Sequence, residues 1–160
     1  MIEEFTGIAA LARSSLTELR GLLSALRDET DDAQLVPQPT LADLQVLVER
    51  IVAAGTPVTV TVAPDLPEIP RGVALSAYRI VQEALSNVVR HAGGVPTTVE
   101  VLVEESRLRI TVTNAAPPVT RPVGSGLGLR GLRERASLLG GTLEVDQPDG
   151  GWRVRAELPI

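Results

Sequence analysis

The order of strands and helices along the chain constrains the fold more than any other feature of the sequence. Two runs of alternating β-formers, 97–104 and 107–113, are separated by a tight turn near Ser106 and predict a β-hairpin. Two further predicted strands, 142–146 and 152–158, flank a turn at 148–151. Helices precede and interrupt these strands without alternating regularly with them. This order predicts an α+β two-layer sandwich rather than a βαβ array.

The remaining elements follow from apolar periodicity and from residues that begin or end helices. Thr40 is suited to cap a helix at 41–54, which Gly55 ends. The other expected elements are a strand at 57–63, a helix at 73–91 whose broad apolar face includes Val88 and Val89, and a short helix at 128–139.

The N-terminal part of the chain carries a heptad pattern. Apolar and small residues recur at alternating spacings of three and four, at Phe5, Ile8, Ala12, Ser15, Leu19, Leu22 and Leu26. The pattern predicts a bundle helix, with an ordinary amphipathic core helix as the alternative. We therefore expect a helical segment at 1–30, a linker at 31–40 and a second domain at 41–160.

Composition narrows the classes of site and partner. The 160 residues include no Cys and one His, which excludes disulfides and multi-histidine metal sites. The net charge of −5 argues against direct nucleic-acid binding. No apolar run approaches the roughly 20 residues of a membrane span. We expect a cytoplasmic segment without membrane contact, while the full-length protein can still carry an anchor.

Polar residues on the helix at 73–91 are the first candidate site. Glu83, Asn87, Arg90 and His91 follow one another at helical spacings that place them on one side. Carboxylate and amide oxygens suit Mg²⁺, and an arginine compensates phosphate charge. The alternatives are a solvated helix face and, for His91, a structural histidine at a helix end.

A glycine-rich segment at 124–128 is the second candidate. Its glycines allow backbone N–H groups to approach a phosphate, and the helix that follows adds partial positive charge. It lacks the Gly-Lys-Ser/Thr of a Walker loop. Alone it is equally compatible with a flexible connector.

Taken together, the two segments resemble a known family. Residues 78–92, Tyr-Arg-Ile-Val-Gln-Glu-Ala-Leu-Ser-Asn-Val-Val-Arg-His-Ala, resemble the N-box of the GHKL ATPases. Within the GHKL ATPases, these residues are most similar to those of sensor histidine kinases that act with helix-turn-helix response regulators. Residues 126–136 and 138–143 resemble the last glycine box and the helix after it. Residues 8–27 resemble the second helix of the dimerisation and phosphotransfer hairpin.

The resemblance implies a fold and a reaction. The fold would be the Bergerat type, a mixed, mainly antiparallel sheet backed by helices, with ATP as the bound nucleotide. The reaction would transfer the γ-phosphoryl group to a histidine and then to an aspartate of a response regulator. Asn87 would bind Mg²⁺, Glu83 would accept a proton or orient water, and Arg90 and His91 would line the phosphates. In this fold ATP would lie between the helical layer and a lid, and the backbone of the lid would comprise Gly124, Gly126, Leu127, Gly128 and Leu129.

The sequence departs from the family pattern in two places. Where the family has Asp-x-Gly, this chain has Asn114, Ala115 and Ala116. Asn114 can accept from the adenine amino group and donate to a ring nitrogen, without the charge-assisted bond of Asp. We expect ATP binding to be weakened but retained. The family's acceptor histidine would precede residue 1, so this chain alone is not expected to autophosphorylate.

Two other functions compete with the kinase interpretation. An anti-sigma-factor kinase shares the N-box but does not need the heptad helix at 5–26. A degenerate scaffold that dimerises or binds partners would explain Asn114 and Ala116, although Glu83, Asn87 and the glycines are retained. The kinase interpretation further implies a response-regulator partner and a homodimer through the complete hairpin.

Overall fold

The computed structural model describes residues 38–116 and 127–160, so the heptad helix expected at 1–30 lies outside the described residues. The elements in chain order are the 3₁₀ turn η1 (Leu41–Asp43), α2 (Leu44–Ala53), β1 (Val58–Val62), α3 (Arg71–Asn87), the π-helical segment η2 (Val88–Ala92), β2 (Thr97–Glu104), β3 (Arg107–Asn114), α4 (Leu127–Leu138), β4 (Thr142–Asp146), the 3₁₀ turn η3 (Pro148–Gly150) and β5 (Trp152–Pro159).

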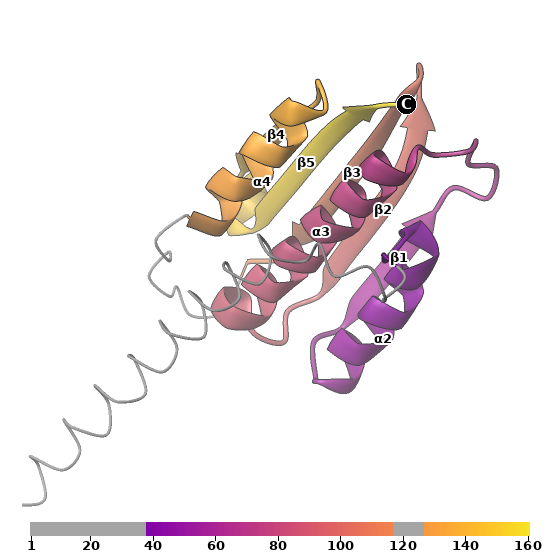
Figure 1. The fold of residues 1–160 in the computed structure, drawn as a ribbon. Helices are drawn as coiled ribbons and strands as arrows, with labels where there is room; N and C mark the ends of the chain where they lie inside the picture. Colours follow the sequence, from indigo (N-terminus) through magenta and orange to yellow (C-terminus); the bar gives the residue numbers. More distant parts are fainter. Residues whose placement is uncertain (1–37, 117–126) are drawn as a thin grey trace, which may run out of the picture. The chain divides into compact units, whose positions relative to one another are not determined.

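The five strands form one mixed sheet, and α2, α3 and α4 lie on one of its faces (Figure 1). The strand order is β1-β2-β3-β5-β4, with β1 and β2 parallel and the other neighbours antiparallel. Parallel strands need a long crossover, and α3 lies within the connection from β1 to β2. The predicted two-layer sandwich with a mainly antiparallel sheet is confirmed.

Local sequence explains where several elements begin and end. Ahead of η1, the backbone N–H and the hydroxyl of Thr40 both donate to the carboxylate of Asp43, at 2.7 and 3.0 Å. Gly55, just beyond α2, has a φ of +97°, which glycine adopts without a Cβ penalty. In the β2–β3 hairpin, Glu105 and Ser106 both have positive φ, the backbone that a two-residue turn needs to match strand twist.

The core between the helices and the sheet is built from aliphatic side chains. Ala77, Ile80 and Leu85 of α3 are fully buried, as are Ile110 of β3 and Val154 of β5. Tyr78 and Trp152 are only partly buried beside this core. The apolar side of α3 is therefore fixed against the sheet, which determines the direction in which its polar side chains point.

The opposite face of the sheet is polar. Arg109 of β3 donates to Glu157 of β5 at 3.1 Å and forms an ion pair with Glu104 of β2 at 2.6 Å. Arg153 of β5 pairs with Asp146 of β4. Alternation of apolar and charged residues is expected when one face of an antiparallel sheet meets water. None of the helices in the described ranges is long and apolar enough to cross a membrane.

Candidate functional site

The candidate site is built on the C-terminal part of α3. Glu83 and Asn87 stand one helical turn apart and are half-buried. Leu85, which lies between them in sequence, is fully buried in the core. Because the core fixes the orientation of α3 about its own axis, Glu83 and Asn87 are held at a defined position beside the helical layer.

The end of α3 differs from the prediction of an α-helix to residue 91. The last turn, η2, is π-helical, and the N–H of Gly93 donates to the carbonyl of Val88, five residues earlier, at 2.9 Å. The wider turn keeps Val88 buried and leaves Val89 39% exposed, so the prediction that Val89 lies on the apolar face is wrong. Arg90 and His91 both lie on this segment, and single π turns are frequent at functional sites.

Arg90 turns back along the helix toward the polar pair. Its Nη2 donates to Oε1 of Glu83 at 3.2 Å and to Oγ of Ser86 at 3.0 Å. The sequence analysis missed Ser86, although its position four residues before Arg90 could have indicated the contact.

The first turn of α4 meets Glu83 from another part of the chain. A methyl group at Gly128 would overlap Oε1 of Glu83 and lie 3.1 Å from its Cδ. Leu127 begins α4, and Leu129 packs against the hydrophobic core. Gly124 and Gly126 lie outside the described residues. The structure thus brings Glu83, Arg90 and Gly128 together.

Asn114 ends β3 at a separate part of the predicted site. The residue is 4% exposed, and its Nδ2 donates to the carbonyl of Ala115 at 2.7 Å. This bond occupies one donor of the amide and fixes its orientation, while Oδ1 remains an acceptor. The exposed Ala116 follows the strand. Gly151, which the sequence analysis did not single out, lies so close that a Cβ there would overlap the backbone oxygen of Asn114.

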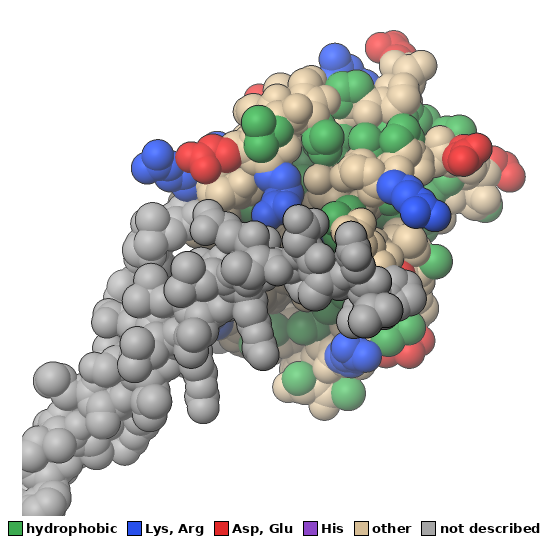
Figure 2. Space-filling model, in the orientation of Figure 1, with side chains coloured by type: hydrophobic (Ala, Val, Ile, Leu, Met, Phe, Trp, Pro, Cys, Tyr) green, Lys and Arg blue, Asp and Glu red, His purple; other side chains and the backbone are tan. Residues whose placement is uncertain are grey.

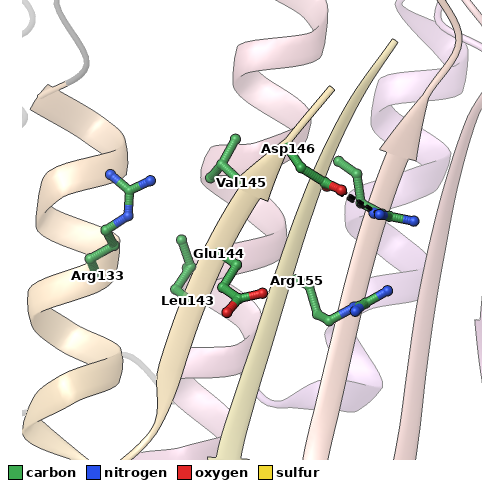
Figure 3. Close-up of a pocket in the computed structure, with 7 residues that line it drawn as sticks. Arg133, Leu143, Glu144, Val145, Asp146 and Arg155 are labelled. Carbon is green, nitrogen blue, oxygen red and sulfur yellow. Dashed lines mark hydrogen bonds and ion pairs between the residues drawn. The ribbon is translucent and has the colours of Figure 1, made fainter. Parts of the chain in front are cut away.

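Within the described residues, a second group of charged side chains lies at the edge of the sheet. A hollow of about 360 Å³ lies at the β4 edge, with Arg133 on α4 and Glu144 and Arg155 on the sheet (Figure 3). Its Asp146 is paired with Arg153, which lowers the pKa of Asp146 through a side-chain hydrogen bond. On the face seen in Figure 2, basic side chains are separate spots among the coloured residues.

Comparison with known proteins identifies the family. Residues 72–160 match the family model described as histidine kinase-, DNA gyrase B- and HSP90-like ATPase. The chain belongs to this ATPase family. The matched range contains α3 from Gly72 onward, η2 and α4, and it includes every described residue of the predicted site.

Relatives of this ATPase domain include bacterial sensor proteins. The sensor protein VraS of Staphylococcus epidermidis is 36% identical over 96 residues, which cover 58% of this chain and 28% of the relative. VraS of Staphylococcus saprophyticus is 35% identical over 108 residues, which cover 64% of this chain and 31% of the relative. The chain thus spans less than a third of the length of these relatives.

Solved structures of histidine kinases share the fold. The blue-light activated histidine kinase of Erythrobacter litoralis EL346 aligns with a TM-score of 0.60 and 26% identity, over 96% of this chain and 57% of that one. The histidine kinase AdeS of Acinetobacter baumannii aligns with a TM-score of 0.62 at 11% identity, over 94% of this chain and 84% of that one. The second similarity concerns the fold alone.

Proposed function

We propose that this ATPase domain is the catalytic domain of a two-component sensor histidine kinase, which transfers the γ-phosphoryl group of ATP to a histidine on a hairpin helix outside this chain. The observation that supports it most is the juxtaposition of Glu83 on α3 and Arg90 on η2 with Gly128 at the start of α4. A carboxylate can orient the nucleophile in phosphoryl transfer, and a guanidinium and a helix N-terminus can compensate phosphate charge.

The half-buried Asn87 is proposed to bind Mg²⁺ through its amide oxygen. Mg²⁺ is usually bound by one or two protein side chains together with phosphates and water, so a single amide is sufficient on the protein side. When bound, the ion would neutralise charge on the β- and γ-phosphates. Within residues 38–116 and 127–160, no three His, Cys, Asp or Glu side chains gather as a metal site.

The transfer step assigns a role to each charged residue. The bond between the γ-phosphorus and the bridging oxygen breaks, ADP leaves, and a bond forms between phosphorus and an imidazole nitrogen of the acceptor histidine. Glu83 would accept the imidazole proton, or would orient water on an ion held by Asn87. Arg90 compensates phosphate charge, and His91 lines the same side.

The remaining predicted contacts concern the base and the lid. Oδ1 of Asn114 is proposed to accept from the adenine amino group, because Nδ2 is held by Ala115. The neutral acceptor would bind more weakly than a carboxylate. Ala116 is proposed to border the adenine. The lid backbone is proposed to comprise Gly124, Gly126, Leu127, Gly128 and Leu129.

The partners follow from the kinase assignment. We propose homodimerisation of the full-length protein through its hairpin, and phosphorelay to the aspartate of a response regulator with a helix-turn-helix output domain. The only histidine in these 160 residues is His91, on η2, which we do not assign as the acceptor.

Titration calorimetry with ATP tests the nucleotide site. We expect binding that strengthens with Mg²⁺, loss of this strengthening in Asn87→Ala, and its retention in Asn87→Asp, which keeps an oxygen ligand. Circular dichroism of each variant checks the fold. Equal Mg²⁺ dependence in the unmutated chain and Asn87→Ala would exclude Asn87 as the ligand. If the unmutated chain binds no ATP, the degenerate scaffold becomes the better interpretation.

A further inference from the structure

We propose that Gly128 and Arg90 are positioning residues for Glu83, and that Glu83 and the nucleotide phosphates compete for Arg90. The first part rests on contacts within the chain, whereas the competition rests on the proposed ATP-binding function. The proposal gives Gly128, the first glycine of α4, a role toward a side chain of this protein, in addition to any role toward phosphate.

Both positioning residues lie next to the same atom of Glu83. Oε1 accepts from Nη2 of Arg90 at 3.2 Å, and Oε1 is also the atom that a methyl group at Gly128 would overlap. The Cδ and Cγ atoms of Glu83 would lie 3.1 and 3.6 Å from that methyl group. The carboxylate oxygen Oε1 therefore occupies the space that the missing Cβ of Gly128 leaves open.

Neighbouring groups favour this position of the carboxylate. Ser86 accepts from the same Nη2 of Arg90 at 3.0 Å, which directs the guanidinium toward Glu83. The N-terminus of α4 carries partial positive charge, and no acidic residue occurs in its first turn to compensate it. Glu83 is the only acidic residue of α3, so no like charge on its own helix opposes it.

The arrangement has a consequence for anion binding. A phosphate that approaches Arg90 meets a guanidinium already paired with a carboxylate, and must share it with Glu83 or displace Glu83. With side-chain exposures of 56% for Arg90 and 31% for Glu83, the ion pair is partly solvated. Such pairs are weak enough to exchange, so we expect the competition to change phosphate affinity by about two- to fivefold.

A carboxyl-detected NMR experiment tests the positioning. The chain is labelled with ¹³C in its glutamate carboxyl groups, and the Glu83 signal is assigned by its loss in Glu83→Gln. We expect this signal to shift in Gly128→Ala and in Arg90→Ala. It should stay in place in Gly131→Ala, the same substitution on the same helix at a position with no atom within 4 Å.

A small loss of stability in Gly128→Ala is compatible with the proposal, because the flexible Glu83 side chain can move away from the new methyl group. A Glu83 signal that Gly128→Ala leaves unmoved, or that Gly131→Ala moves equally, would overturn the positioning role. This test uses no nucleotide and is therefore independent of the proposed function.

Titration with the ATP analogue adenylyl imidodiphosphate, in EDTA to exclude the metal, tests the competition. We expect Glu83→Gln to bind the analogue about two- to fivefold more tightly than the unmutated chain. The affinity for AMP should be the same in both. In an Arg90→Ala background, Glu83→Gln should have no further effect. An unchanged affinity in Glu83→Gln, or an increase that persists without Arg90, would refute the competition. Absence of analogue binding by the unmutated chain, both in EDTA and with Mg²⁺, would overturn it together with the proposed function.

Discussion

Leu85 and Leu138 allow the contribution of the core to be measured with one substitution at two sites. Leu85 of α3 is fully buried, whereas Leu138 at the end of α4 is 87% exposed. Leu→Ala removes three carbons, each worth about 0.8 kcal/mol of transfer free energy, or about 2.4 kcal/mol in all. At Leu85 the cavity adds to this loss, so we expect a total of about 3–5 kcal/mol.

At Leu138 the same change removes no buried contact, and we expect a free energy of unfolding within about 0.5 kcal/mol of the unmutated chain. Urea unfolding followed by circular dichroism measures both values. With a change of about 3 °C per kcal/mol for a chain of this size, Leu85→Ala should lower the Tm by about 9–15 °C. A loss below about 1 kcal/mol at Leu85, or equal losses at the two sites, would refute the packing of α3 described above.

The remaining predictions concern a close backbone approach and an ion pair. A methyl group at Gly141 would overlap the backbone oxygen of Glu157, which cannot move aside, so Gly141→Ala should destabilise by about 1–3 kcal/mol in urea unfolding. Gly72→Ala, with no atom within 4 Å, is its control, and equal stability of the two variants would contradict the contact. The hydrogen bond from Arg153 lowers the pKa of Asp146 below its ordinary value of 3.8. The resulting stabilisation is present above about pH 4 and is lost as the pH falls through the lowered pKa. Unfolding in urea from pH 5 to 2.5 should therefore show a larger loss of stability in the unmutated chain than in Asp146→Asn, and parallel losses would refute the assignment.

Much of the fold is predictable because its signals are local. The alternating pattern gave the hairpin of β2 and β3 within one residue, and its turn falls on Glu105 and Ser106. Gly55 and Gly93 follow helical segments with positive φ, as helix-ending glycines do. Such features depend on a few neighbouring residues, so the sequence contains what is needed to predict them.

Helix boundaries without an apolar signal were predicted less well. The helix was expected to begin at Val73, where the apolar face begins, but α3 begins at Arg71. Pro70 explains the difference, because its carbonyl accepts the first helical bond from Ala74 at 2.9 Å, while Arg71 and Gly72 are exposed. The π-helical turn of η2 also has no periodic signature in five residues.

Tertiary contacts within the candidate site were beyond local reasoning. The helical spacing placed Glu83 of α3 and Arg90 of η2 on one side of the helix, as their ion pair shows. The contact of Glu83 with Gly128 joins residues on α3 and α4, and the approach of Gly151 to Asn114 depends on the pairing of β3 with β5. No spacing in the sequence encodes either contact, because strand order and helix docking are set by the whole core.

A ¹⁵N NMR titration with adenylyl imidodiphosphate and Mg²⁺ tests the location of the nucleotide site most directly. The proposed site predicts shifts of the backbone amides at Asn87, in η2, at Gly128 and at Asn114, with little change along β4. Shifts concentrated on β4 around the hollow in Figure 3, or no shifts at millimolar analogue, would contradict an ATP site between α3 and α4.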